Sequence, residues 1–259
     1  MMSFWPNAHA LVTGAGSGIG AATAIALANA GVRVSIAGRR IDALKATAAA
    51  LGKHAGAVVS IDVTGEAAVT KGIAQIAAEA GPIDILVNNA GKAGSAPFDK
   101  TGAALWADML ASNLSSVFLV TQAVLPDMAQ RGRGRVINVA STAGLTGYAY
   151  VSAYVAAKHG IVGLTKVTAL ETAKEAITCN AICPGYVLTP IVEKQIPDQM
   201  KTHNMSREDV IAKVMLARQP SGQFATVDQI GATTVFLCSD AAAQITGTTI
   251  SVDGGWTAL

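Results

Sequence analysis

Ala8-His-Ala-Leu-Val-Thr-Gly-Ala-Gly-Ser-Gly-Ile-Gly20 is the stretch that decides the fold of this chain. Its first five residues are an apolar run of strand length, and the alanine-rich residues 21–30 behind it favour a helix. Strand, glycine turn and helix in this order present backbone N–H groups at a helix N-terminus, where a pyrophosphate binds well. The spacing Gly14-x3-Gly18-x-Gly20 departs from the strict G-x-G-x-x-G fingerprint, so a purely structural turn is the alternative interpretation at this point.

The three spaced glycines have distinct expected roles. Gly14 should let the chain turn sharply, and Gly18 should leave room for backbone N–H groups to approach a pyrophosphate. Gly20 should allow close packing of the helix.

Apolar runs of strand length alternate with helical segments along the rest of the chain. After Ala8–Val12, the runs are Val32–Ala37, Ala57–Ile61, Ile83–Asn88, Arg135–Ala140, Ile177–Cys183 and Thr248–Val252. Seven such strands predict an α/β fold: one Rossmann-type, doubly wound parallel sheet with helices on both faces. We expect residues 1–259 to form a single NAD(P)-binding domain. Ligands bind at the carboxyl ends of such strands, so the loops that follow them should line one cleft.

Residues 188–222 form the one irregular region. Pro190, Pro197 and Pro220 surround a helix-like stretch there. We interpret this region as a lid over the substrate.

Composition limits the class of protein. Of 259 residues, 51% are hydrophobic and 14% are charged, which suits a soluble globular protein with a large core. A net charge of +2 without long runs of Lys or Arg gives no sign of a nucleic-acid or membrane partner. The densest basic cluster, residues 131–135, is interpreted as a solvated loop before a strand. No signal-peptide pattern or long apolar stretch is present, so we expect a cytoplasmic location.

The cysteines indicate neither disulfides nor a metal site. There are three, an odd and sparse set for a secreted protein. Cys179 and Cys183 lie in one apolar strand, and Cys238 lies near the end of an apolar helix. We expect all three to be buried small hydrophobes, and the absence of clustered His and Cys predicts no metal.

Tyr154, Lys158 and Ser141 form a pattern suited to proton transfer. Residues 152–159 should be helical, which places Tyr154 and Lys158 one turn apart on the same face. A free phenol titrates near pH 10, and a neighbouring ammonium would favour its ionised form and bring it closer to working pH. Such a phenol can exchange a proton with an alcohol or carbonyl oxygen.

Together these motifs resemble the short-chain dehydrogenase/reductase family over essentially the whole chain. The further matching segments are Asp62-Val63, Asn88-Asn-Ala-Gly91, Asn113, Pro184-Gly185 with Thr189, and Asp253-Gly-Gly255. The C-terminal half is most similar to D-3-hydroxybutyrate dehydrogenases, in stretches such as Ala153-Tyr-Val-Ala-Ala-Lys-His-Gly and Ile245-Thr-Gly-Thr-Thr.

The resemblance implies a catalytic tetrad. Tyr154 would be the general acid and base, and Lys158 would lower its pKa and hold the nicotinamide ribose. Ser141 would hydrogen-bond the substrate oxygen, and Asn113 would hold a water that links Lys158 to solvent. Taken singly, the four could instead be a packed aromatic, a surface charge, a strand-end cap and a helix-bending polar group. His159 is interpreted as structural.

The resemblance also implies a set of coenzyme-binding residues. They are Gly14, Ser17, Gly18, Ile19, Gly20, Arg39, Arg40, Asp62, Val63, Asn89, Ala90, Gly91, Tyr154, Lys158, Pro184, Gly185, Val187 and Thr189. For Asn88 and Asn89, fixing backbone turns is an equally good interpretation.

Coenzyme choice depends on the end of the second strand. An NAD enzyme usually has a carboxylate there for the ribose 2′-hydroxyl, whereas Gly38 offers none and Arg39 could pair with a 2′-phosphate. NADP(H) is therefore expected, with NAD(H) possible because arginine also stacks on adenine. Arg40 would either assist or begin the next helix.

The predicted substrate pocket departs from that of the hydroxybutyrate dehydrogenases. Ala93, Ala143 and Val151 stand where those enzymes have a glutamine, a histidine and a lysine, so a buried carboxylate would be poorly compensated. Tyr186 replaces a tryptophan, and Gln195 is kept. The expected pocket residues are Ala93, Ala143, Tyr148, Val151, Tyr186 and Gln195, with Tyr150 as a further aromatic neighbour.

The sequence therefore predicts an NADP(H)-dependent oxidoreductase that interconverts a ketone and a secondary alcohol. The substrate would be an uncharged 3-oxoacyl thioester or a bulky aryl or cyclic ketone. One alternative is an NAD-dependent 3-hydroxy acid dehydrogenase, with Lys92 or Lys194 as the replacement cation; another is a non-catalytic dinucleotide sensor. The family implies a homotetramer paired through Ala104–Met128, Ser152–Lys174 and the C-terminal strands. Trp256 could join that interface or cap its own core.

Overall fold

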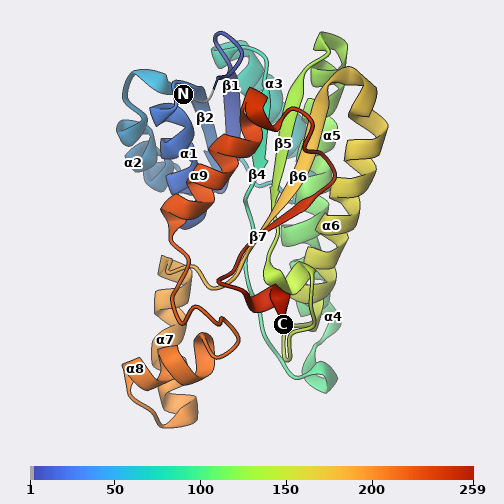
Figure 1. Cartoon of the computed structure of the whole chain (residues 1–259). Helices are drawn as coiled ribbons and strands as arrows, with labels where there is room; N and C mark the ends of the chain where they lie inside the picture. Colours follow the sequence, from blue (N-terminus) through green and yellow to red (C-terminus); the bar gives the residue numbers. More distant parts are fainter. Residues whose placement is uncertain (1–2) are drawn as a thin grey trace.

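In the computed structural model, which describes residues 3–259, seven parallel strands form one sheet (Figure 1). The strands are β1 (His9–Thr13), β2 (Arg33–Gly38), β3 (Ala55–Ser60), β4 (Ile85–Asn88), β5 (Gly134–Val139), β6 (Ile177–Pro184) and β7 (Thr249–Val252). Their order is β3-β2-β1-β4-β5-β6-β7. The winding direction therefore changes between β1 and β4, where a ligand crevice opens in this class of sheet. The predicted α/β fold is confirmed, and each strand lies within about two residues of its predicted position.

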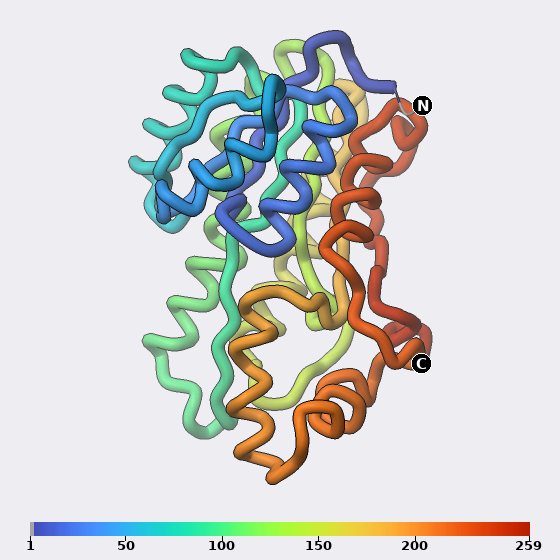
Figure 2. Tube along the Cα trace, turned by 90° about the vertical axis from the view of Figure 1, so that its left-hand side faces the viewer, coloured from blue at the N-terminus to red at the C-terminus, as the bar shows by residue number. Residues whose placement is uncertain are grey.

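Helices cover both faces of the sheet (Figures 1 and 2). One layer consists of α1 (Gly18–Asn29), α2 (Ile41–Leu51) and α9 (Val227–Cys238). The opposite layer consists of α3 (Glu66–Ala80), α5 (Ser116–Arg131) and α6 (Ser152–Thr172), with α4 (Ala103–Leu110) packed on α6. This is the doubly wound arrangement that alternating strands and helices predict.

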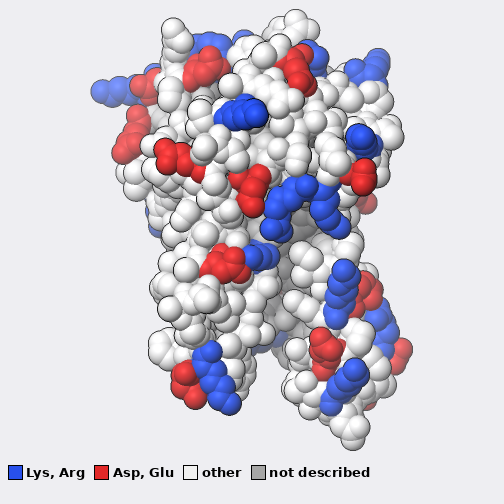
Figure 3. Space-filling view, turned by 180° about the vertical axis from the view of Figure 1, so that it is seen from behind, with Lys and Arg blue, Asp and Glu red and all other residues white. Residues whose placement is uncertain are grey.

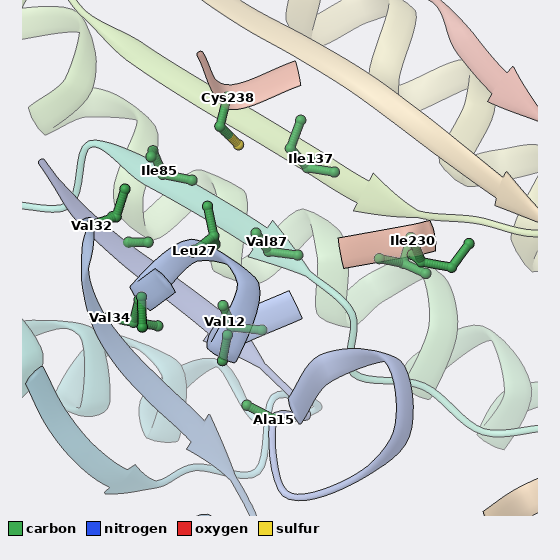
Figure 4. Packing of buried hydrophobic residues seen from close by; sticks show 14 of the residues in the cluster. Val12, Ala15, Leu27, Val32, Val34, Ile85, Val87, Ile137, Ile230 and Cys238 are labelled. Atoms are coloured by element: carbon green, nitrogen blue, oxygen red, sulfur yellow. The ribbon is translucent and has the colours of Figure 1, made fainter. Parts of the chain in front are cut away.

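The central strands of the sheet contribute side chains to two separate cores, one on each face. Leu11 packs with the layer of α3 and α5, whereas its neighbour Val12 packs with the layer of α1 and α9. Figure 4 shows Val12 and Ile137 of the sheet together with Leu27 of α1 and Ile230 of α9. Because successive strand residues point to opposite faces, a strand covered on both sides must be apolar throughout.

One long helix is interrupted in the middle. Residues 103–131 run through α4, a π-helical segment Ala111–Ser115 and α5. By length and composition this 29-residue helix could cross a membrane, but the core helix of a soluble protein passes the same test. Here α5 packs against β4, β5 and α3.

The basic cluster at residues 131–135 does precede and enter a strand, but the interpretation of its arginines as solvated is wrong. Arg135 lies in β5 and is only 3% exposed, with its guanidinium 4.5 Å from the ring centre of Trp5. Arg131 and Arg133 both form ion pairs with the buried carboxylate of Asp84. The cluster therefore stabilises contacts at the end of the sheet where the strands begin.

The three cysteines are buried and free. Cys179 and Cys183 lie in β6, and Cys238 ends α9. Burial raises the pKa of the Cys179 thiol to about 12, as expected of a small buried hydrophobe.

The irregular region before α9 contains two short helical units with a small core of their own. They are α7 (Pro190–His203) and α8 (Arg207–Val210), which is followed by a π-helical segment, Ile211–Met215. Ile196, Val210 and Met215 are buried together there. Thr189 is the N-cap residue of α7, and its hydroxyl accepts a hydrogen bond from the Val192 N–H.

Candidate active site

A cleft of about 810 Å³ opens at the carboxyl ends of the strands. It is lined by the loops that follow β1, β2, β3, β4, β5 and β6, together with α7 and the C-terminal turn. Figure 3 shows a groove between two lower lobes of the molecule, with Lys and Arg side chains gathered at its upper end. The residues predicted for catalysis, coenzyme binding and substrate contact line this cleft, with the exception of Tyr150.

The glycine loop is held against the end of β4. Gly14 has a φ of +66°, and a Cβ there would lie 2.8 Å from the Ala90 Cα. The Asn89 side chain donates hydrogen bonds to the carbonyl oxygens of Thr13 and Gly14, at 2.9 and 3.2 Å. Asn89 thus fixes a backbone turn and lines the cleft as well.

Gly20 is needed for a different contact from the one expected. A Cβ on Gly20 would lie 2.3 Å from the Asn89 Nδ2 and 2.6 Å from the Gly14 carbonyl oxygen. The crowding comes from the loop itself, whereas close packing between helices occurs at Gly231 of α9 against Ala26 of α1. Asn88 also has a structural role, because its amide donates to Thr121 and Asn138 inside the core.

The loop geometry fits a dinucleotide. Gly18 begins α1 with a φ of +56°, a conformation that favours glycine. Ser17, at the N-cap, makes no side-chain cap hydrogen bond, so the first N–H groups of α1 face the cleft without a side-chain acceptor. A helix N-terminus of this kind suits a pyrophosphate.

Two arginines lie at the end of β2. Arg39 and Arg40 are exposed and line the cleft, and Arg40 is also the N-cap residue of α2. Next to them, the Asp62 carboxylate accepts hydrogen bonds from the Thr64 hydroxyl and N–H, at 2.7 and 3.1 Å. These bonds lower the pKa of Asp62, with smaller contributions from the charges of Arg39 and Lys92.

Tyr154 and Lys158 lie one turn apart on α6, as their spacing predicts. The Lys158 Nζ is 5.5 Å from the centre of the Tyr154 ring and donates a 2.8 Å hydrogen bond to the Val139 carbonyl. Burial lowers the pKa of Lys158 to about 8.

The expected lowering of the Tyr154 pKa by Lys158 is not found. Burial raises the pKa of the Tyr154 phenol, and a hydrogen bond with the Ser141 side chain lowers it in part. The Ser141 hydroxyl also accepts a 3.1 Å hydrogen bond from the Ala143 N–H, so Ser141 caps a short turn as well.

Asn113 lies inside the π-helical segment. Its amide donates a 3.0 Å hydrogen bond to the Met109 carbonyl, and its Oδ1 accepts from the Lys92 N–H at 3.2 Å. A π-helical turn of this kind is common at functional sites, and here it brings a buried polar side chain to the cleft. Asn113 therefore both distorts its helix and lines the site.

The other half of the cleft has an aromatic wall. Trp256 is buried there, with its ring centre 5.6 Å from that of Tyr148 and 6.0 Å from that of Tyr186. Sequence reasoning left the position of Trp256 open, although its place directly after Asp253-Gly-Gly255 was a usable signal. Tyr150 does not line the cleft; its side chain is 68% exposed, so that expectation is wrong.

This chain belongs to the short chain dehydrogenase family, whose family model matches residues 8–200. It is an oxidoreductase that acts on CH–OH groups. The resemblance inferred from the motifs is confirmed.

Individual relatives cover nearly the whole chain. It is 46% identical to the D-beta-hydroxybutyrate dehydrogenase of Rhizobium meliloti (strain 1021), over 96% of this chain and 98% of the relative. It is 41% identical to a monensin polyketide synthase putative ketoacyl reductase of Streptomyces virginiae, over 95% of each chain. A crystal structure of an actinorhodin polyketide ketoreductase variant with NADPH matches with a TM-score of 0.92 and 35% identity, over 98% of each chain.

Proposed function

We propose that this enzyme interconverts an uncharged ketone and a secondary alcohol with NADP(H). A 3-oxoacyl thioester or a bulky aryl or cyclic ketone is the favoured substrate class. The observation that carries this proposal is the apolar lining of the substrate half, where Ala93, Ala143 and Val151 border the cleft. A carboxylate buried against such a wall would lack a cationic partner and would bind poorly.

The four tetrad residues have separate roles in this proposal. Tyr154 gives its proton to the carbonyl oxygen during reduction and takes it back during oxidation. Ser141 hydrogen-bonds the same oxygen, while Lys158 holds the ribose and Asn113 holds a water on the proton path. The nicotinamide coenzyme, when bound, supplies or accepts the hydride. Residues 188–222 act as the lid, since Ile191, Val192 and Gln195 of α7 line the cleft.

Substrate charge can be tested directly. Initial rates of NADPH oxidation would be compared for acetoacetate, an acetoacetyl thioester and a bulky aryl ketone, each repeated with NADH. We expect activity on the uncharged compounds and little on acetoacetate. Preference for acetoacetate would contradict the apolar-pocket argument. A Tyr154→Phe variant is the control, because a non-catalytic sensor would be unaffected by it.

The NADP(H) preference is supported by Gly38 and Arg39. A Gly38→Asp variant should shift preference from NADPH to NADH, because the carboxylate binds a ribose 2′-hydroxyl and repels a 2′-phosphate. The site tolerates the new side chain: a Cβ there comes no closer than 3.6 Å to Leu44. The ratio of kcat/KM for the two coenzymes is the measurement, and an unchanged ratio would count against the role of Gly38 and Arg39.

A second candidate function is an NAD-dependent 3-hydroxy acid dehydrogenase. The 46% identity to a D-beta-hydroxybutyrate dehydrogenase and the position of Gln195 in the cleft favour it. Its required cation would be Lys92, which lines the cleft but forms a 2.6 Å ion pair with Asp108. The acetoacetate arm of the substrate experiment separates the two functions.

We also propose a homotetramer. Phe118 of α5 and Leu170 of α6 are 46% and 81% exposed, on the two helices through which the family implies pairing. Sedimentation equilibrium should give four chains per particle, and a Leu170→Glu variant should give smaller particles.

A further inference from the structure

Two phenol groups meet across the substrate half of the cleft. The hydroxyl oxygens of Tyr148 and Tyr186 are 2.8 Å apart and share a hydrogen bond. Tyr148 comes from the loop between β5 and α6, and Tyr186 comes from the loop after β6. Both residues line the cleft, so the pair bridges two of its walls.

Neighbouring side chains pack against the rings of Tyr148 and Tyr186. Trp256 packs against both rings, and Phe224 meets Tyr186 edge to face at 6.5 Å. The Arg218 guanidinium lies 6.0 Å from the centre of the Tyr148 ring. Packing of this kind fixes the positions of the two hydroxyls before any ligand arrives.

The backbone around the pair is fixed as well. The Tyr186 N–H donates a 3.2 Å hydrogen bond to the side chain of buried Gln219. The Asp253 carboxylate accepts hydrogen bonds from the N–H groups of Gly255 and Thr257, at 3.0 and 2.9 Å. These bonds hold the turn that carries Trp256.

The pair has one unused donor. Two phenols carry two O–H donors, and their mutual hydrogen bond uses one of them. Burial raises the pKa of Tyr186 well above its ordinary value, so the Tyr186 phenol keeps its proton at neutral pH. The second O–H can therefore donate to an oxygen on a ligand, which is favourable because an unpaired donor in a partly buried site is costly.

The Lys and Arg side chains that line the cleft lie away from the hydroxyl pair, and Arg218, whose guanidinium is 6.0 Å from the centre of the Tyr148 ring, is exposed and does not line the cleft. Within residues 3–259, the Lys and Arg side chains that line the cleft are Arg39, Arg40, Lys92 and Lys158. Arg39 and Arg40 lie at the end of β2, and Lys158 is hydrogen-bonded to Val139 behind Tyr154. Lys92 is paired with Asp108, and its charge acts on Asp62 near β2.

We propose that the Tyr148–Tyr186 hydroxyl pair binds a second, uncharged oxygen of the substrate. The preferred ketone would then carry an ester, thioester, keto or hydroxyl oxygen a few bonds from the reacting carbonyl. The pair lies on the same cleft as Tyr154, which holds the reacting oxygen in the proposed function. This inference rests on that function and narrows its substrate class.

The test compares two uncharged ketones of equal size. Ethyl acetoacetate has a second carbonyl, whereas 2-octanone has the same number of non-hydrogen atoms and none. Tyr148→Phe, Tyr186→Phe and the double variant keep the rings and remove the hydroxyls. We expect kcat/KM for ethyl acetoacetate to fall about fivefold to tenfold, mainly through KM, as for the loss of one hydrogen bond. The value for 2-octanone, which has no second oxygen to lose, should fall clearly less.

The expected pattern has a second part and a matched control. Because the two hydroxyls act as a unit, the double variant should lose little more than the more affected single variant. Tyr150→Phe removes a phenol hydroxyl outside the cleft and should leave both substrates unaffected.

Each other result overturns a defined part of the proposal. Equal losses on both ketones would mean that the hydroxyls only support the fold, and the inference would fail while ketone reduction stood. A larger loss on acetoacetate than on its ethyl ester would mean that the pair binds a carboxylate. Inactivity of the unaltered enzyme on every ketone would overturn the proposed function itself.

Discussion

At the residue scale, Gly20 shows how one missing side chain can govern a binding loop. Its Cα faces the Asn89 amide and the Gly14 carbonyl, so the loop after β1 and the loop after β4 meet at this point. The backbone at Gly20 is helical, so space is what requires glycine here, in contrast to Gly14 and Gly18, which have positive φ.

A Gly20→Ala variant should therefore be destabilised. The added methyl would force Asn89 or the loop to move, at a cost of about 1–3 kcal/mol in the free energy of unfolding. Coenzyme binding should weaken as well. Urea unfolding and a coenzyme titration would measure the two effects. Gly163→Ala in α6 is the matched control, because nothing lies within 4 Å of its Cβ position and alanine favours a helix. Equal stability of the two variants would contradict the crowding argument.

Lys158 should impose a pH limit on ketone reduction. Its pKa is lowered to about 8 by burial, so its charge is lost as pH rises through that value. The raised pKa of Tyr154 keeps the phenol protonated over the same range. We expect kcat/KM for reduction to be level below about pH 8 and to fall above it, because a neutral lysine no longer stabilises the forming phenolate. A profile that stays level well above this pH would show that Lys158 remains charged.

At the element scale, the N-terminus of α9 is set by a capping box. The Thr226 hydroxyl accepts from the Gln229 N–H at 3.2 Å, and the Gln229 side chain accepts from the Thr226 N–H at 2.9 Å. The helix then packs across α1, directly behind the glycine loop. This cap supports the site from outside it, since neither residue lines the cleft.

Thr226→Ala should lower the free energy of unfolding by about 1 kcal/mol, the usual cost of a lost N-cap. Turnover at saturating substrate should be unchanged. Thr233→Ala in the same helix is the control, because the Thr233 hydroxyl only bonds the Gln229 carbonyl within the helix. Chemical denaturation of both variants would decide, and a loss in Thr233→Ala as large as in Thr226→Ala would refute a specific capping effect.

At the scale of the whole molecule, His9 connects several elements at the end of the sheet where the strands begin. Its Nδ1 donates to the carbonyls of Gly81 and Pro82, and its Nε2 accepts from the Ser35 hydroxyl at 2.7 Å. The Ser35 oxygen in turn accepts from the Ala57 N–H. One buried imidazole thereby connects β1, β2, β3 and the turn before β4.

This link should make the fold sensitive to acid. Burial lowers the pKa of His9 below its ordinary 6.5, and the charge of Arg33 acts in the same direction. Below pH 6.5 the unfolded chain takes up a proton that the folded chain resists, so the free energy of unfolding falls as pH falls. Urea unfolding over this range should show a smaller pH effect in His9→Gln than in the unaltered protein. The control variant His203→Gln, at an exposed site, should keep the original pH effect.

Much of the fold and site could be predicted because their signals are local. Apolar runs of strand length predicted the seven strands, and the positions of residues directly after those strands predicted the lining of the cleft. The spacing of Tyr154 and Lys158 gave their shared helix face. Each of these predictions depends on the residue period of a helix or strand, or on the rule that ligands bind at the carboxyl ends of parallel strands.

The remaining features depend on contacts between distant segments. Residues 103–131 have continuous helical character, so the π-helical segment around Asn113 leaves no mark in the sequence. Arg135 was predicted to be solvated because its sequence neighbours do not reveal that the distant Trp5 ring covers its guanidinium. The direction of the Tyr154 pKa shift follows from burial, which only the assembled fold determines.

The position of Trp256 also allows binding in the cleft to be followed by tryptophan fluorescence. The chain has three tryptophans in three settings: Trp5 over Arg135, Trp106 partly exposed on α4, and Trp256 in the wall of the cleft. Replacing Trp5 and Trp106 by phenylalanine would leave a single indole beside the bound molecules. Its emission overlaps the absorption of a reduced nicotinamide, so energy transfer would report coenzyme occupancy and its rates of arrival and departure without any turnover.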